Sequence, residues 1–181
     1  MRYVVTGASG AGKSTLLRHL KGLGFECREE VGRQLVREQR AIGGAALPDK
    51  DCAAFRDLLF DRSIDAFDQE PVRAGVPVFY DRSFLEALAY SEIIGVPVPK
   101  RMVVAAMQRR FAPLVFVCAP WREIFECDAE RHHDFDFACR DYAANVSVYR
   151  AYGYTLVEVP QMCVEDRVQF VIQQIEKAGG C

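Results

Sequence analysis

Gly7-Ala8-Ser9-Gly10-Ala11-Gly12-Lys13-Ser14 follows the pattern G-x-x-x-x-G-K-[ST], which is typical of a phosphate-binding loop placed between a strand and a helix. The residues before it, Tyr3-Val4-Val5, form a short apolar run that suits a buried strand. After it, residues 15–21 have the leucine spacing of a helix, which Gly22 and Gly24 then end. The surroundings of the pattern therefore agree with the pattern itself.

The chemistry of the loop follows from its residue types. The glycines let the backbone turn its N–H groups inward around phosphate oxygens, and the start of the following helix directs its positive dipole end at the same anion. We expect Lys13 to reach the β- and γ-phosphates and the Ser14 hydroxyl to bind Mg²⁺. The sequence thus predicts binding of ATP with Mg²⁺, and the residues expected to hold it are Gly7, Ser9, Gly10, Ala11, Gly12, Lys13, Ser14 and Thr15.

Beyond the loop, apolar runs of strand length alternate with segments of helical periodicity. Further strands are predicted at 25–29, 76–80, 114–118 and 154–159, and further helices at 31–40, 51–69, 84–94, 100–110, 123–152 (with a break at 133–134) and 164–175. This alternation predicts parallel β-α-β units in a three-layer α/β/α sandwich. Because no linker or repeat interrupts the chain, we expect one domain over residues 1–181.

Composition limits the classes of partner. The 181 residues carry a formal net charge of −2, which gives no overall electrostatic case for nucleic acid or an anionic membrane. No run of 18 apolar residues predicts a transmembrane helix. The seven scattered cysteines contain no C-x-x-C pair, which argues against a disulfide framework or a zinc site. We expect a cytoplasmic protein that acts as a monomer or homodimer.

One carboxylate stands where a metal ligand is expected. Asp81 follows the apolar run Val76-Pro77-Val78-Phe79-Tyr80, and ligands of parallel sheets bind at the carboxyl ends of strands. A carboxylate there would help Ser14 to hold Mg²⁺. The alternative role for Asp81 is to cap the helix that begins near Ser83.

A second acidic position follows the predicted strand at 25–29. Glu30 could take a proton from a substrate hydroxyl, although its neighbour Glu29 could hold the same place. Arg33 lies one helical turn further on and Arg82 lies beside Asp81. A guanidinium at either position could bind an anionic group of the acceptor, or it could face solvent.

Charged side chains crowd the segment from Arg122 to Asp141. Phosphoryl transfer needs cations over the transferred group and exclusion of water, so residues 120–140 could form a helical lid that brings Arg122 or Arg131 onto ATP. A solvent-facing helix with internal ion pairs is the alternative. Trp121, the single tryptophan, could stack on a base or fill the core.

These motifs together resemble a known family. The phosphate loop is similar to that of small-molecule kinases, and Asp81-Arg82-Ser83 is similar to the Asp/Glu-Arg-Ser/Tyr motif of deoxynucleoside and thymidylate kinases. As a whole the chain resembles the predicted AAA-type ATPases and kinases that are related to the kinase domain of the NAD-biosynthesis protein NadR. The other matching segments are residues 30–33, 46–48, 78–80, 95–99, 120–125, 128–131, 159–160 and 165–168.

The resemblance implies a P-loop kinase-like fold with a five-stranded parallel sheet. It also implies a lid around Arg122 to Arg131 and an adenine pocket near Pro160. Arg167 would then be an adenine contact, or it would lie on the surface of the last helix.

Two functions remain open at this point. In the first, the protein is a small-molecule kinase that transfers the γ-phosphoryl of ATP to a hydroxyl of a nucleoside- or riboside-like acceptor. Glu30 would be the base, and Ser14 and Asp81 would bind Mg²⁺. Lys13, with Arg122 or Arg131, would stabilise the transition state. In the second, it is an ATPase or a nucleotide-dependent switch regulated by a partner. No N-K-x-D signature for guanine occurs, so we expect adenine as the base.

Overall fold

The computed structural model of the chain describes residues 1–69, 71, 75–125 and 134–179. Its centre is a parallel sheet with the strand order β2-β3-β1-β4-β5. The strands are β1 (Arg2–Gly7), β2 (Glu26–Arg28), β3 (Val78–Asp81), β4 (Leu114–Cys118) and β5 (Thr155–Glu158). This confirms the predicted α/β class and the five-stranded parallel sheet.

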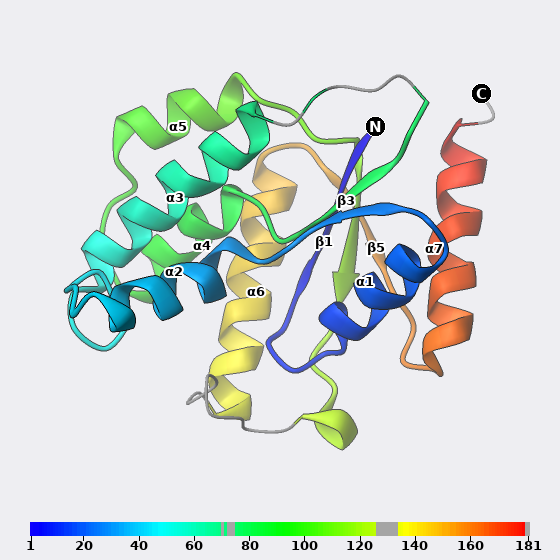
Figure 1. Cartoon of the computed structure of the whole chain (residues 1–181), viewed down its shortest axis with the longest axis horizontal. Coiled ribbons are helices and arrows are strands. Elements are labelled where there is room, and N and C mark those ends of the chain that lie inside the picture. The colour runs from blue at the N-terminus through cyan, green and yellow to red at the C-terminus, as the bar shows by residue number, and fades with distance from the viewer. Residues whose placement is uncertain (70, 72–74, 126–133, 180–181) are drawn as a thin grey trace.

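Helices cover both faces of this sheet (Figure 1). They are α1 (Lys13–Gly22), α2 (Val31–Ala41), α3 (Cys52–Asp68), α4 (Leu85–Ile93), α5 (Lys100–Met107), α6 (Phe135–Ala151) and α7 (Val164–Gly179), with a short 3-10 turn η1 (Arg122–Ile124) after β4. In Figure 1, α1 and α7 lie on one side of the sheet, and α3, α4, α5 and α6 lie on the other.

The pleat of β1 explains the layers. Successive side chains of a strand point to opposite faces of the sheet. Tyr3 and Val5 accordingly pack with α1 and α7, whereas Val4 packs with residues of α3, α4, α5 and α6. Val4 and Val5 are completely buried, which fits a central strand covered on both faces.

Register brings two functional segments together. Val5 of β1 lies opposite Asp81 of β3, and Gly7 lies opposite Cys118 of β4. The loop after β1 and the carboxylate that ends β3 therefore emerge at the same edge of the sheet, where ligands of open α/β sheets bind.

The charged helical segment predicted at 123–152, with a break at 133–134, is described in the structure only outside residues 126–133. Its described part consists of η1 and then α6, which begins at Phe135. Asp134 caps α6, because its side chain accepts a hydrogen bond of 2.7 Å from the Phe137 amide. The predicted break at 133–134 therefore coincides with a helix start. Among the described residues no helix is long and apolar enough to cross a membrane.

Candidate functional site: a phosphate loop beside a buried carboxylate cluster

The loop between β1 and α1 needs its glycines. Gly7 has a φ of +117°, and a Cβ there would collide with the backbone carbonyl of Cys118. Gly12 has a φ of +75° and is the N-cap of α1, and a Cβ there would lie 2.5 Å from a guanidinium nitrogen of Arg167. Left-handed backbone and close packing both exclude larger residues at these positions. The amides of the loop are thus placed at the start of a helix, as an anion site requires.

Lys13 lies inside this loop. Its side chain is buried, and its Nζ donates hydrogen bonds to the carbonyls of Gly7 at 3.0 Å and Ala8 at 2.6 Å. Burial lowers the pKa of Lys13, and the charge of Arg82 lowers it further. Asp81 and Glu30 act in the opposite direction without cancelling this effect, and a bound triphosphate would add negative charge that favours the ammonium form.

Asp81 and Ser14 form the second part of the site. The Ser14 hydroxyl lies 3.5 Å from Oδ2 of Asp81, while Oδ1 is buried without a hydrogen-bond partner. Burial, followed by repulsion from Glu30, raises the pKa of Asp81 to about 6. A buried carboxylate oxygen with no partner is costly, and a hydroxyl with a carboxylate is a donor pair that suits Mg²⁺.

The alternative role of Asp81 as a helix cap is not seen. The N-cap of α4 is Phe84, and the Leu85 amide donates to the hydroxyl of Ser83 at 3.2 Å. Among the described residues, no group of three or more His, Cys, Asp or Glu side chains forms a metal site. A metal at Ser14 and Asp81 would therefore take its other ligands from phosphate and water.

Asp81 belongs to a cluster of buried and half-buried charged side chains, and Glu30, rather than Glu29, is a second member of it. Its carboxylate accepts a hydrogen bond of 3.1 Å from Nε of Arg33 and lies 3.4 Å from Nε of Arg82. Burial raises the pKa of Glu30, but the charges of Arg82, Lys13 and Arg33 outweigh it, so the pKa is lowered overall. Glu29 is exposed and accepts from Gln34 at 3.4 Å.

Arg82 connects carboxylates of the cluster. Its guanidinium forms ion pairs with Glu30, Glu86 and Asp141. Its backbone has a φ of +69°, the one positive value among described residues other than glycine. Strain of this kind persists where the surroundings fix it and is frequent at functional sites. Arg82 is therefore not a solvent-facing side chain.

Two buried residues, Thr6 and Glu86, and the half-buried Asp141 complete the cluster, and the sequence did not place them there. The Thr6 hydroxyl, directly before the loop, donates to Glu86. Glu86 also accepts from the hydroxyl of Tyr149 at 3.4 Å, and burial raises its pKa. Asp141 of α6 binds Arg82 and the Asn145 amide. A faint signal existed for Glu86, which is an isolated acid in an otherwise apolar helix start, one turn after Arg82.

A cavity of about 1050 Å³ runs over these groups. One end is lined by Ser9, Gly10, Gly12, Lys13, Ser14 and Thr15 of the loop. An apolar hollow within it is formed by Phe55, Leu59, Tyr80, Tyr90 and Phe111, and Trp121, Ile124, Met162, Val164 and Arg167 also line the cavity. Ile124 and Arg167 lie next to Gly12 of the loop. The volume is at the upper end of the range for small-molecule sites, so it has room for two substrates.

Arg167 lies under the phosphate loop and not on the surface of α7. It is buried, and its Nη2 donates to the Ala11 carbonyl and contacts Sγ of Cys118, both at 3.1 Å. Its guanidinium carbon is 5.6 Å from the ring centre of Trp121. Trp121 is half-buried and lines the cavity, so it does not fill the core.

Other residues expected at the site lie at its edge. Arg122 is exposed and rests over the ring of Phe135 at 4.2 Å, and it does not line the cavity. Pro160 does not line it either, although Met162 just after it does. Arg131 lies outside the described residues, as does the middle of the lid expected at 120–140. The lid and its arginines stay a prediction.

The comparisons with known proteins identify the family and the fold. A family model described as an AAA domain matches residues 2–167. The chain belongs to this family. No curated protein sequence matches it significantly.

The fold of this AAA-domain protein is shared with several kinases of solved structure. A NadR protein in complex with NR is 18% identical with a TM-score of 0.73, over 99% of this chain and 52% of NadR. Deoxyadenosine kinase from M. mycoides is 13% identical with a TM-score of 0.68, over 98% and 100% of the two chains. Shikimate kinase from Aquifex aeolicus is 17% identical with a TM-score of 0.55, over 99% and 98%. The resemblance to P-loop kinase-like proteins is thereby confirmed for the fold.

Proposed function

We propose that the protein is an ATP- and Mg²⁺-dependent kinase that transfers the γ-phosphoryl group of ATP to a hydroxyl of a nucleoside- or riboside-like acceptor. The observation that carries the proposal is the position of Glu30, Asp81 and Arg82. These residues line the same cavity as Lys13 of the phosphate loop. That cavity includes the apolar hollow, which the loop does not fill. A protein that only bound or hydrolysed ATP would not need this second hollow.

The phosphate end of the cavity fits a Mg²⁺–triphosphate. The loop amides and Lys13 would hold the β- and γ-phosphates, and Ser14 with the partnerless oxygen of Asp81 would hold the metal. Bound Mg²⁺ would neutralise charge on the phosphates. Arg167, which donates a hydrogen bond to the Ala11 carbonyl, would stabilise the conformation of the loop.

The acceptor end fits a flat, partly apolar molecule with hydroxyl groups. Phe55 and Tyr90 pack edge to face at 5.7 Å, and Phe111 packs edge to face with Tyr80 at 5.2 Å. Aromatic walls of this kind suit a base or similar ring. Two of the structurally similar proteins are named for, or contain, such ligands: a deoxyadenosine kinase and the NadR–NR complex.

In this proposal Glu30 acts on the acceptor hydroxyl. Its lowered pKa keeps it ionised at neutral pH, so it accepts a hydrogen bond from the hydroxyl and orients it. The hydroxyl oxygen attacks the γ-phosphorus, the bond from that phosphorus to the β–γ bridging oxygen breaks, and the proton passes to Glu30 as ADP leaves. Arg82 and Arg33 hold the carboxylate in place.

A screen of acceptors tests this proposal. Nucleosides, ribosides and sugars would be incubated with Mg²⁺ and ATP, and ADP and phosphorylated products would be measured by mass spectrometry. We expect one acceptor class to give stoichiometric product, with Lys13→Ala inactive and the exposed Lys177→Ala unchanged. Tight ATP binding with acceptor-independent hydrolysis, and no product from any acceptor, would refute the kinase and favour the switch or ATPase.

A further inference from the structure

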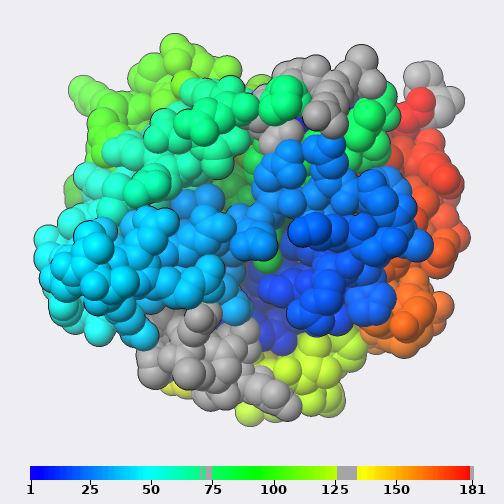
Figure 2. Space-filling model, in the orientation of Figure 1, coloured from blue at the N-terminus to red at the C-terminus, as the bar shows by residue number. Residues whose placement is uncertain are grey.

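A second, smaller cavity of about 270 Å³ lies beside the main cavity, between α1, β2 and α2. We call it the α1–α2 groove. It shares Ser14, Glu30, Arg33 and Asp81 with the main cavity, so the two are continuous at the predicted metal site. Figure 2 shows the face of the molecule on which the α1 and α2 segments meet.

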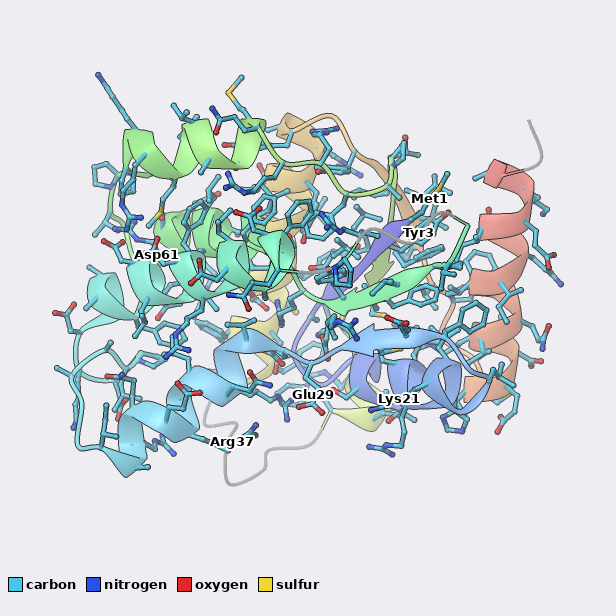
Figure 3. The ribbon with its side chains drawn as sticks, turned by 45° about the horizontal axis from the view of Figure 1, so that its top comes forward. Met1, Tyr3, Lys21, Glu29, Arg37 and Asp61 are labelled. Atoms are coloured by element: carbon cyan, nitrogen blue, oxygen red, sulfur yellow. The ribbon has the colours of Figure 1, made fainter. Side chains whose placement is uncertain are left out.

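The groove collects positive charge from three elements. Five of its lining residues are cations, namely Arg18, Lys21, Arg28, Arg33 and Arg37, against three carboxylates. Two of the five are paired, Arg28 with Glu26 at 2.9 Å and Arg33 with Glu30 at 3.1 Å. The whole chain carries a net charge of −2, so this accumulation runs against the overall balance. In Figure 3, Glu29, which follows β2, lies between Arg37 on α2 and Lys21 on α1.

Helical spacing builds the two walls. Ser14, Arg18 and Lys21 lie four and three residues apart on α1, and Arg33 and Arg37 lie four apart on α2. Residues at such spacing share one face of a helix. Cationic side chains from two helices thus line one groove, which favours an anion between them.

The carboxylates of the groove, whose side chains the structure describes, do not pair with the cations of its α1 wall, Arg18 and Lys21. Glu30 faces Arg82, outside the groove, as well as Arg33, and Glu29 accepts from Gln34. Asp81 is the predicted metal ligand. Among the residues that the structure describes, no carboxylate forms an ion pair with Arg18 or Lys21. The positive field also reaches Cys27 on the groove wall, where Lys21 and Arg28 oppose the rise that burial causes in its pKa.

We propose that the α1–α2 groove binds a phosphate-type anion next to the metal site. Its volume is small for a whole metabolite but sufficient for one phosphate group, for which clustered guanidinium groups are the usual partners. The anion is either a phosphate carried by the acceptor or a free anionic effector. Binding of the anion does not require that the proposed kinase activity exist.

The test uses inorganic phosphate as the probe. The phosphate loop is first saturated with Mg²⁺ and the non-hydrolysable analogue AMP-PNP, so that phosphate cannot bind there. Phosphate is then titrated at constant ionic strength while the backbone amide resonances of the labelled protein are followed by NMR. We expect saturable shifts around Lys21 and Arg37.

A matched pair of variants decides the outcome. Arg18→Gln with Lys21→Gln removes two charges from the groove, and Lys100→Gln with Lys177→Gln removes two exposed charges from α5 and α7. We expect the first pair to weaken phosphate binding by about three- to tenfold and the second pair to leave it unchanged. Equal affinity in all three proteins, or equal loss in both variants, would overturn the proposal.

The source of the anion is separated by the same titration. A riboside and its phosphate ester are compared with free phosphate. If the acceptor carries the group, the ester shifts resonances of both the groove and the apolar hollow and binds more tightly than either probe alone. If the anion is an effector, free phosphate and the ester shift the groove equally and the hollow is unaffected.

Discussion

The protonation of Asp81 gives a prediction that separates a metal ligand from a structural acid. Its pKa of about 6 leaves the carboxyl about nine-tenths ionised at pH 7 and about one-tenth ionised at pH 5. A metal ligand must be deprotonated. We therefore expect the affinity of the nucleotide-bound protein for Mg²⁺ to fall about tenfold between pH 7 and pH 5 through Asp81 alone.

The assay is a Mg²⁺ titration in the presence of AMP-PNP, followed by the fluorescence of Trp121, the single tryptophan, which lines the cavity. The terminal phosphate of the nucleotide also takes up a proton near neutral pH, so the comparison is with Asp81→Asn. That variant should bind Mg²⁺ more weakly at pH 7 and show only the pH dependence of the nucleotide. Equal pH dependence in both proteins would refute the role of Asp81.

The same substitution should stabilise the metal-free protein. A carboxyl whose pKa is higher in the folded state than in the unfolded state makes the folded state less stable as pH rises through that interval, here from about 4 to about 6. Asp81→Asn removes this cost, and we expect a gain of about 1–3 kcal/mol in the free energy of unfolding at pH 7. Denaturant unfolding measures it, and a loss of stability would show that Asp81 serves the fold.

Three further predictions concern the neighbours of this carboxylate. Lys13→Ala should abolish Mg²⁺-dependent binding of ATP in calorimetry and cost about 1–3 kcal/mol of stability, because the carbonyls of Gly7 and Ala8 lose their donor; unchanged ATP binding would contradict this role. Glu30→Gln should lower kcat for the acceptor by about 10²- to 10⁴-fold and leave ATP affinity within about twofold, and an unchanged kcat would exclude it as the base. Arg167→Met should cost about 1–3 kcal/mol of stability and weaken ATP binding, since the Ala11 carbonyl loses its donor; unchanged unfolding and binding would contradict this.

Local patterns in the sequence were sufficient for the fold. The phosphate loop, the apolar strands and the helix at 164–175 each carry a period or a motif within a dozen residues, and the structure has β1, α1 and α7 where these signals lie. Asp81 was identifiable for the same reason, because it directly follows an apolar run.

The buried polar cluster could not be predicted in that way. Thr6 and Glu86 are 80 residues apart in sequence, and Arg82 and Asp141 are 59 apart. A charged residue in the sequence is expected at the surface, and only its partners in space make its burial possible. Arg167 illustrates the point, since surface exposure and burial at the loop were equally compatible with its place in α7.

The distribution of ion pairs within the cluster has a consequence for metal binding. Four buried or half-buried carboxylates line the cavity, and three of them, Glu30, Glu86 and Asp141, pair with Arg82. Asp81 is adjacent in sequence to that arginine, yet among the described residues it forms no ion pair. Were Asp81 paired, Mg²⁺ would have to break that pair before binding. Because Arg82 holds the other three, Asp81 keeps an oxygen that could bind a metal, and a bound Mg²⁺ would bring positive charge next to the carboxylate of these four that has no ion pair with a described residue.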